Sequence, residues 1–364
     1  MGILRLVLAL SVVVGHSGAP ILGFSGTDAF SAVQAFFMIS GFYITLVLDS
    51  KYISFSQNIT FWANRFLRLY PAYLIGLALS IIAILLRNEM HDYVQTFDTT
   101  SWMAKLFMVS SNLTMLGQDI PYWACVHNAY GGCLNDWNLI LDPPTWSLSV
   151  ELMFYAVAPF IVRQPRRIAV FLLAGLLYHS LASWLHWEAL RVPGFVHFDT
   201  QKVFYFMFPS SVLFFALGAL SYHVVYKRTA EKRKLGVGSY VFLVAVIIWL
   251  AEMNSGTFFL GWKEAILLFF AIPVLFNLTT HNRFDRFVGD LSYPIYVVHF
   301  PLILVLRKIG FSGASLADAA AAAAIVLAVV IAVFVESPVD KFRQRFARRR
   351  IAHAGQVGQM QPCR

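Results

Sequence analysis

Charged side chains are scarce in this sequence of 364 residues, where Asp, Glu, Lys and Arg make up 13% of the chain. A soluble globular domain carries about 25% charged residues, so the composition excludes an ordinary soluble protein. Cysteine is scarce as well, and three cysteines are too few for a disulfide-stabilised scaffold. The sequence also lacks a repeat of fixed period and a linker that would separate two soluble domains.

Apolar and aromatic residues are abundant instead. Hydrophobic residues make up 59% of the chain, which includes 33 Phe, 15 Tyr and 9 Trp, and the mean hydropathy is +0.66. Aromatic rings are common in membrane proteins, above all at the level of the lipid headgroups. We therefore expect an integral membrane protein, and the net charge of +9 needs a membrane explanation before it is taken as a sign of nucleic-acid binding.

The apolar runs predict an all-α, polytopic transmembrane bundle of about ten spans, at about 17–25 residues per span. The stretch Trp102–Leu116 is short and amphipathic, so we expect it to lie at the membrane interface or to re-enter rather than to span. The predicted spans lie near residues 3–21, 29–49, 69–87, 147–162, 168–187, 204–226, 236–252, 258–279, 291–307 and 317–335.

Basic residues predict the orientation of these spans. Placing the N-terminus inside puts most of the 28 basic residues on connections that face the cytoplasm. Both termini are then cytoplasmic. The chain divides into a transmembrane domain, residues 1–340, and a basic cytoplasmic tail, residues 341–364.

The first apolar segment, MGILRLVLALSVVVGHSGAP, has two interpretations. Its basic start, apolar middle and small residues at Ser17–Ala19 are typical of a cleavable signal peptide. Cleavage would remove the helix that begins the alternation of basic loops, so we favour a first transmembrane helix.

Arg5 and His16 lie in this first helix. Their separation of eleven residues is close to three turns, which places both on one helix face with His16 about 16 Å further out. An ionisable residue within the membrane is a candidate site residue. The other interpretation of His16 is a packing histidine that is hydrogen-bonded to a neighbouring helix.

The next two spans carry further polar residues. Gln34 precedes the run FFMISGF, in which we expect the small residues Ser40 and Gly41 to allow close helix packing. In FWANRFLRLYPAYL, Arg65 and Arg68 are three residues apart and share a helix face at the inner surface. They either anchor the helix by the positive-inside rule or bind a phosphorylated cytosolic ligand, since guanidinium groups bind phosphate bidentately.

Two later spans also contain candidate residues. In TWSLSVELMFY, Ser147 and Glu151 are four residues apart and share a face, with Glu151 about one turn inside the membrane. The stretch LSYPIYVVHFPLI places Tyr293, Tyr296 and His299 in one span. His299 lies near mid-depth, where it is either a site residue or a hydrogen-bonding partner of another helix.

Five blocks, in this order, resemble the acyltransferase 3 family of multi-span membrane O-acyltransferases, which modify bacterial surface and secreted glycans. They extend from residue 5 to about residue 302, and although each is weak alone, the ordered set is specific. The blocks are Arg5 with ten residues to His16, VQAFFMISGFYI, RFLRLYPAYL, WSLSVELMFY and LSYPIYVVHFPLI. The resemblance implies a ten-helix core in the bacterial inner (plasma) membrane that receives acyl-CoA, usually acetyl-CoA, from the cytosol.

The resemblance also implies three pairs of site residues, which match Arg5 with His16, Arg65 with Arg68, and Ser147 with Glu151. The sequence departs from the family pattern at two positions. Gln34 stands where many members have an acid, and Leu152 stands where many have a second acid. No esterase-like domain follows the bundle, so we expect the catalytic unit to act alone or with separate polysaccharide assembly proteins.

The mechanism that we expect uses His16 as the general base on a sugar hydroxyl, with Glu151 either orienting its imidazole or stabilising the imidazolium that forms during attack. A covalent acyl-histidine is the alternative. Arg5 would serve the inner end of an acyl-CoA tunnel. Acetyl-CoA is then a co-substrate, with no permanently bound cofactor and no metal, and the acceptor is a saccharide or lipid-linked saccharide. The candidate acceptor-side or supporting residues are Ser147, Tyr296, His299 and Gln34.

Two other functions remain open at this point. A proton-coupled transporter or flippase for a glycan or lipid would also use intramembrane His and Glu. It would leave Arg65 and Arg68 without a phosphate, and the sequence shows no inverted repeat. A non-catalytic membrane component of a polysaccharide assembly complex is the third interpretation. Transfer of label from acetyl-CoA to a glycan separates the enzyme from both.

The segment from Gly117 to Thr145 is predicted to be an outer loop. It contains YWACVHNAYGGCLNDWN, whose aromatic rings, Asn and Asp suit sugar recognition, although a simple capping loop is the other interpretation. Cys125 and Cys133 enclose seven residues and would face an oxidising compartment, so we predict a disulfide between them that affects acceptor use.

Overall fold

The computed structural model describes residues 1–87, 90–124, 139–184, 205–229 and 260–347. Within these ranges the regular secondary structure is helical and no β-strand occurs, which confirms the all-α prediction. An isolated bridge pairs Ile21 with Phe24 in the connection after the first helix.

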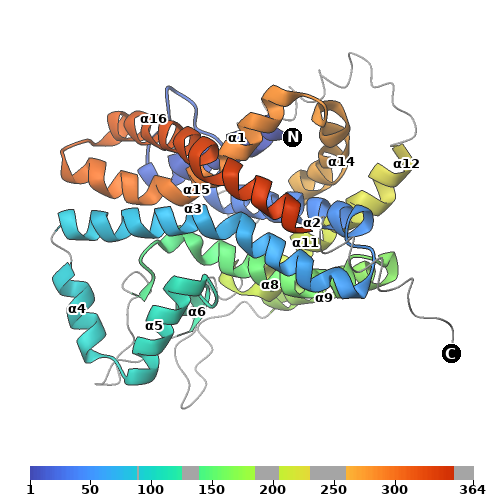
Figure 1. The fold of residues 1–364 in the computed structure, drawn as a ribbon, viewed down its shortest axis with the longest axis horizontal. Coiled ribbons are helices and arrows are strands. Elements are labelled where there is room, and N and C mark those ends of the chain that lie inside the picture. Colours follow the sequence, from blue (N-terminus) through green and yellow to red (C-terminus); the bar gives the residue numbers. More distant parts are fainter. Residues whose placement is uncertain (88–89, 125–138, 185–204, 230–259, 348–364) are drawn as a thin grey trace.

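Figure 1 shows the arrangement of the described helices. In chain order they are α1 (Gly2–Ser17), α2 (Ala29–Ser50), η1 (Phe55–Gln57), α3 (Asn58–Leu86), α4 (Met90–Thr99), α5 (Trp102–Thr114), α6 (Ile120–Trp123), η2 (Pro143–Thr145), α8 (Trp146–Ile161), α9 (Pro165–Trp184), α11 (Phe208–Ser221), η3 (Tyr222–Tyr226), α12 (Lys227–Thr229), α14 (Trp262–Thr279), α15 (Arg283–Lys308), α16 (Gly313–Ile331) and η4 (Ala332–Glu336). The helix that contains η4 continues to Ala347.

Six helical segments in the described part of the chain are long and apolar enough to cross a membrane. They are Ala29–Ser50, Phe55–Leu86, Phe208–Tyr226, Trp262–Thr279, Arg283–Lys308 and Gly313–Ala347, and the shorter helix α1 is also apolar. The chain is therefore a multi-pass membrane protein. The count of about ten spans is not confirmed, and the predicted span at residues 236–252 lies outside the described residues. The cytoplasmic location of both termini stays a prediction.

Helix α3 begins earlier than the sequence analysis predicts. The expected span opened at residue 69, close to Pro71, because proline is common at the start of a helix. In the structure one continuous helix runs from Asn58 to Leu86, with Pro71 inside it. Proline is tolerated within transmembrane helices, where neighbouring groups satisfy the freed backbone carbonyl. Arg65 and Arg68 therefore lie within this long helix and not in the connection before it.

Helix α3 crosses the middle of the molecule, with α15 and α16 on one side and α8 and α9 on the other (Figure 1). Helix α2 packs closely on α11, because Gly41 and Gly218 each bring their backbone against the other helix. A Cβ atom on Gly41 would collide with the Phe215 carbonyl, and one on Gly218 with that of Met38. The prediction that Gly41 allows close packing is confirmed.

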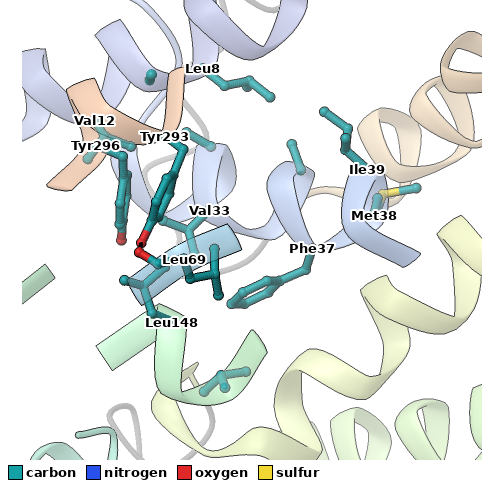
Figure 2. Packing of buried hydrophobic residues seen from close by; sticks show 14 of the residues in the cluster. Leu8, Val12, Val33, Phe37, Met38, Ile39, Leu69, Leu148, Tyr293 and Tyr296 are labelled. Carbon is teal, nitrogen blue, oxygen red and sulfur yellow. Dashed lines mark hydrogen bonds between the residues drawn. The ribbon is translucent and has the colours of Figure 1, made fainter. Parts of the chain in front are cut away.

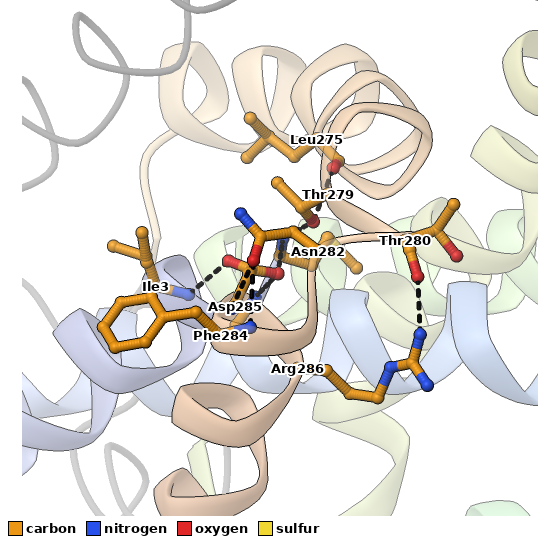
Figure 3. A network of polar contacts seen from close by, with 10 residues as sticks. Ile3, Leu275, Thr279, Thr280, Asn282, Phe284, Asp285 and Arg286 are labelled. Carbon is orange, nitrogen blue, oxygen red and sulfur yellow. Dashed lines mark hydrogen bonds and ion pairs between the residues drawn. The ribbon is translucent and has the colours of Figure 1, made fainter.

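Asp285, in the first turn of α15, caps the start of α1 (Figure 3). Its carboxylate accepts hydrogen bonds from the backbone N–H groups of Gly2, at 2.8 Å, and Ile3, at 3.0 Å. It also forms an ion pair of 2.9 Å with the amino group of Met1. A carboxylate at a helix N-terminus satisfies N–H groups that have no partner within the helix and interacts favourably with its dipole. This contact sets the register of α1 against α15, which run in the same direction.

Candidate active site

A cavity of about 880 Å³ lies between α1, α2, α3, α8, α14, α15 and the C-terminal helix. Six of the residues predicted from the sequence line it: Arg5, Arg65, Arg68, Ser147, Glu151 and Tyr296. His16, His299 and Gln34 do not line the cavity. The structure therefore gathers most of the candidate residues around one space, with the two histidines outside its wall.

One end of the cavity is strongly cationic. Six basic residues and four carboxylates contribute to the wall, and the basic ones come from four different helices and the connection after α2. The basic residues are Arg5, Lys51, Arg65, Arg68, Arg286 and Arg343, and the acidic ones are Glu151, Asp285, Asp290 and Asp340. The excess of positive charge favours an anionic ligand.

The predicted arginines at this end differ in whether they form ion pairs with carboxylates. Arg68 forms ion pairs with Asp290, at 3.3 Å, and with Asp340, at 3.4 Å. The guanidinium of Arg65 lies 5.6 Å from the centre of the Phe61 ring, and its Nε is buried without a hydrogen-bond partner. Like Arg65, Arg5 forms no ion pair with a residue that the structure describes. These two arginines are therefore available to a bound anion, whereas Arg68 is already neutralised.

Glu151 lies further along the cavity, on α8. Its Oε1 accepts hydrogen bonds from Ser40 of α2, at 2.6 Å, and from Tyr155 one turn later on α8, at 2.5 Å. The indole of Trp62 in turn donates to the carbonyl of Tyr155, at 2.9 Å. These two hydroxyl groups hold the carboxylate in place. Ser40 is thus more than the packing residue that the sequence predicts.

Tyr296 and Ser147 close the other end of the cavity. The two hydroxyl oxygens are 2.7 Å apart, and the Tyr296 hydroxyl lies 2.7 Å from the carbonyl oxygen of Pro144. Figure 2 shows Tyr293 and Tyr296 projecting from α15 in the same direction, and Tyr293 donates to the Leu69 carbonyl at 2.7 Å. Both tyrosines are held by backbone carbonyls, so this wall is well defined.

The two histidines meet directly behind Tyr296. His299 Nε2 lies 3.0 Å from His16 Nδ1, and the ring centres are 5.0 Å apart. His299 is fully buried, whereas His16 is half-buried at the end of α1. Arg5 lines the cavity beside Gly289 while His16 meets His299, so both face α15, as their spacing predicts.

The hydrogen bonds of the pair define which nitrogen atoms carry protons. His299 Nδ1 lies 2.6 Å from the carbonyl oxygen of Tyr296, so Nδ1 donates and Nε2 keeps a lone pair in the neutral ring. His16 Nδ1 lies 3.0 Å from both His299 Nε2 and the Val12 carbonyl oxygen, which are both acceptors. The proton of His16 is therefore on Nδ1, and its Nε2 has the free lone pair of a base.

The expectation that Glu151 orients the imidazole of His16 is not met in this structure. Glu151 is bonded to hydroxyl groups inside the cavity, and His299 contacts the ring of His16 instead. Gln34 is buried and accepts a hydrogen bond of 2.5 Å from the Leu260 backbone N–H, which is a structural contact.

Sequence reasoning missed several residues of the cavity. Tyr155 carries a detectable signal, because it lies four residues after Glu151 on the same helix face. Asp340 and Arg343 belong to the stretch that the sequence analysis places in the tail or at its border, and Asp290 lies just before the expected ninth span. Their positions depend on how distant helices meet, which periodicity does not show.

Two acidic residues lie on the connections before α8. Asp119 accepts hydrogen bonds from Ser149, at 2.7 Å, and Trp123, at 3.3 Å, and its burial raises the pKa of the carboxyl group. Asp142 is 1% exposed, and neither of its carboxylate oxygens has a hydrogen-bond partner. Burial without a partner raises the pKa of Asp142 well above its ordinary value.

The segment predicted to be an outer loop is described only at its ends. Cys125 and Cys133, with the disulfide predicted between them, lie outside the described residues. Before the gap, the Tyr122 hydroxyl donates to the Pro143 carbonyl at 2.8 Å, which ties the start of the loop to the start of α8.

A family model described as an acyltransferase domain matches residues 1–336. Nodulation protein 10 of Rhizobium leguminosarum bv. viciae is 27% identical over 336 residues, which cover 85% of this chain and 84% of that protein. O-acetyltransferase OatA of Staphylococcus aureus is 22% identical and peptidoglycan O-acetyltransferase OatA of Listeria monocytogenes is 24% identical, over 85% and 84% of this chain. The chain spans about half the length of these two proteins, 51% and 49%. No solved structure matches the chain.

Proposed function

Because the chain belongs to the acyltransferase 3 family, we propose that it transfers an acetyl group from cytosolic acetyl-CoA to a hydroxyl group of a saccharide at the outer face of the bacterial inner membrane. The observation that carries this proposal is that the two ends of the cavity differ in charge. Free arginines lie at one end, and Ser147 and Tyr296 line the other end. There the centre of the Tyr296 ring lies 5.8 Å from that of His299, the partner of His16. The names of the two OatA relatives support O-acetylation, and that of the Listeria protein supports a glycan acceptor.

The cationic end is the proposed binding site for the nucleotide part of the donor. Coenzyme A carries several phosphate groups that cannot enter lipid, and guanidinium groups bind phosphate with strong charge-assisted hydrogen bonds. Arg65 has an Nε without a hydrogen-bond partner, and Arg5 forms no ion pair with a described residue, so both are available for this task. The pantetheine arm would then extend past Glu151 and place the thioester near Ser147 and Tyr296. This orientation requires the arginine end to face the cytosol, in agreement with the predicted topology.

His16 is the proposed general base. Its unprotonated Nε2 would take the proton of the acceptor hydroxyl while the hydroxyl oxygen forms a bond to the thioester carbonyl carbon. The carbon–sulfur bond then breaks, and the leaving thiolate receives the proton from the imidazolium. The products are the sugar acetate and free coenzyme A. Because His16 does not line the cavity, side chains at this end, such as that of Tyr296, have to move for the thioester to reach the acceptor.

A purified, membrane-reconstituted preparation tests this proposal. With acetyl-CoA labelled in the acetyl group, we expect label to move to an externally supplied glycan or lipid-linked saccharide, and not to move with a His16→Ala variant. Transport of a glycan across the membrane without any transfer of label would instead support the transporter or flippase. Transfer from another acetyl donor but not from acetyl-CoA would contradict the assignment of the cationic end.

A further inference from the structure

The C-terminal helix supplies part of the cavity wall beyond the region that the family model matches. The match ends at residue 336, whereas the helix that contains η4 continues to Ala347. Four residues of this extension, Asp340, Arg343, Gln344 and Ala347, line the cationic end of the cavity. The extension is therefore part of the site.

Arg343 is the one basic residue among these four. Its side chain is 14% exposed, and its guanidinium donates to Asp340 at 3.0 Å. Its Nε is buried and has no hydrogen-bond partner, and the same holds for the Nε of Arg65. Asp340 also pairs with Arg68, at 3.4 Å, so one carboxylate holds two arginines next to each other.

A guanidinium group has five N–H donors, and the ion pair with Asp340 uses only part of this capacity. Arg343 lines the same cavity as Arg65 and Arg5. A buried cation with unused donors is costly unless a ligand or water satisfies it. Arg343 therefore shares two features with Arg65. Both have a buried Nε without a hydrogen-bond partner, and both lie at the cationic end of the cavity.

We infer that Arg343 is a phosphate-binding residue of the donor site, which binds the nucleotide end of coenzyme A together with Arg65. This inference rests on the proposed function, because it assigns a further residue to the same donor site. The C-terminal helix then completes the site from outside the matched domain.

The competing explanation is purely structural: Arg343 would only hold Asp340, and through it Arg68. The Asp340→Asn variant separates the two explanations. It weakens the ion pairs of both arginines but leaves their guanidinium groups and raises the positive charge of the site. A phosphate-binding Arg343 predicts unchanged or tighter binding of coenzyme A by Asp340→Asn, whereas a structural role predicts the same loss as in Arg343→Ala.

Arg345 offers a matched control on the same helix, since it is exposed and does not line the cavity. We would measure binding of coenzyme A and of pantetheine to the full-length protein in detergent or nanodiscs by titration calorimetry. Arg343→Ala should weaken binding of coenzyme A by roughly ten-fold or more, the effect of losing one charge-assisted contact. Arg345→Ala should bind like the wild type, and pantetheine, which lacks the nucleotide, should bind all variants equally.

The outcomes that overturn the inference are distinct from those that overturn the proposed function. Equal affinity of Arg343→Ala and Arg345→Ala for coenzyme A removes Arg343 from the site while the donor assignment stands. Equal losses in Arg343→Ala and Asp340→Asn show a structural role. Failure of the wild-type protein to bind coenzyme A overturns the donor assignment itself, and the inference with it.

Discussion

The Nε2 atom of His299 lies 3.0 Å from the Nδ1 atom of His16, across the contact between α15 and α1. His299 is itself held by the Tyr296 carbonyl, so its free lone pair is directed at the His16 proton. This arrangement leaves Nε2 of His16 as the unprotonated nitrogen. In the proposed mechanism, the buried ring of His299 takes the orienting role that a carboxylate has in many catalytic sites.

This pair predicts a graded loss of turnover. His16→Ala should lower kcat by about 10²–10⁴-fold, the usual contribution of a general base. His299→Leu should lower kcat less, because the Val12 carbonyl still accepts the His16 proton. His299→Gln should retain more activity than His299→Leu, since its amide oxygen can accept the same proton. Steady-state acetyl transfer measures kcat, and binding of coenzyme A should be unchanged in all three variants. Wild-type turnover in His299→Leu would contradict the positioning role.

Arg65 and Arg68 should behave differently, although they are three residues apart on one helix. Arg65→Ala should raise the KM for acetyl-CoA, at a cost of about 1.5–3 kcal/mol for one charge-assisted contact, and leave the thermal stability close to that of the wild type. Arg68→Ala should mainly lower stability, because Asp290 and Asp340 lose their shared cation. Comparing KM with the unfolding temperature in detergent separates the two effects. Equal changes of both quantities in the two variants would rule out this division of roles.

The sequence identifies which residues gather around the cavity better than it predicts their contacts. The spacing of Arg5 and His16 and that of Ser147 and Glu151 identify helix faces, because an α-helix repeats every 3.6 residues. Those faces do meet around one cavity or next to it. Which residues pair across it depends on contacts between distant segments, such as that between Arg68 and Asp340, and no local pattern shows these.

The sequence analysis also misplaced the start of one helix and missed a contact of one small residue. Pro71 suggested a helix start, although the lipid environment allows the helix to continue through it. Ser40 next to Gly41 resembles a packing motif, and its hydrogen bond to Glu151 appears only when α2 and α8 are placed side by side.

Asp142 predicts an unusual dependence of stability on pH. Burial without a partner raises the pKa of this carboxyl group above its ordinary value of 3.8. The folded protein therefore binds the proton more tightly than the unfolded chain, and stability falls as the pH rises from about the ordinary value through the folded-state pKa. Asp142→Asn removes the buried charge, so it should stabilise the protein at pH 7–8 by about 1–3 kcal/mol, with a gain that shrinks toward pH 4.

Thermal unfolding in detergent across this pH range measures the effect of Asp142→Asn. Asp119→Asn is the matched control, because the Asp119 carboxylate accepts hydrogen bonds from Ser149 and Trp123 and its loss should not stabilise the protein. A loss of stability in Asp142→Asn at neutral pH would show that the charged form of Asp142 has a favourable partner.

Tyr296 should determine which acyl groups are transferred, because it lines the end of the cavity next to His299, the partner of His16. The Tyr296 hydroxyl lies 2.7 Å from both Ser147 and the Pro144 carbonyl oxygen, and these contacts hold the ring across the end of the cavity. Tyr296→Phe keeps the ring but loses both contacts, so the ring should move more freely and still exclude long acyl chains.

Tyr296→Ala removes the ring from the end of the cavity, and this variant should raise the turnover of butyryl- and hexanoyl-CoA relative to acetyl-CoA. Acyl transfer with this donor series measures the effect, and Tyr293→Phe, which alters a neighbouring tyrosine but keeps the wall, should leave the preference for acetyl-CoA unchanged. If Tyr296→Ala ranks the three donors as the wild type does, another part of the cavity limits the acyl chain.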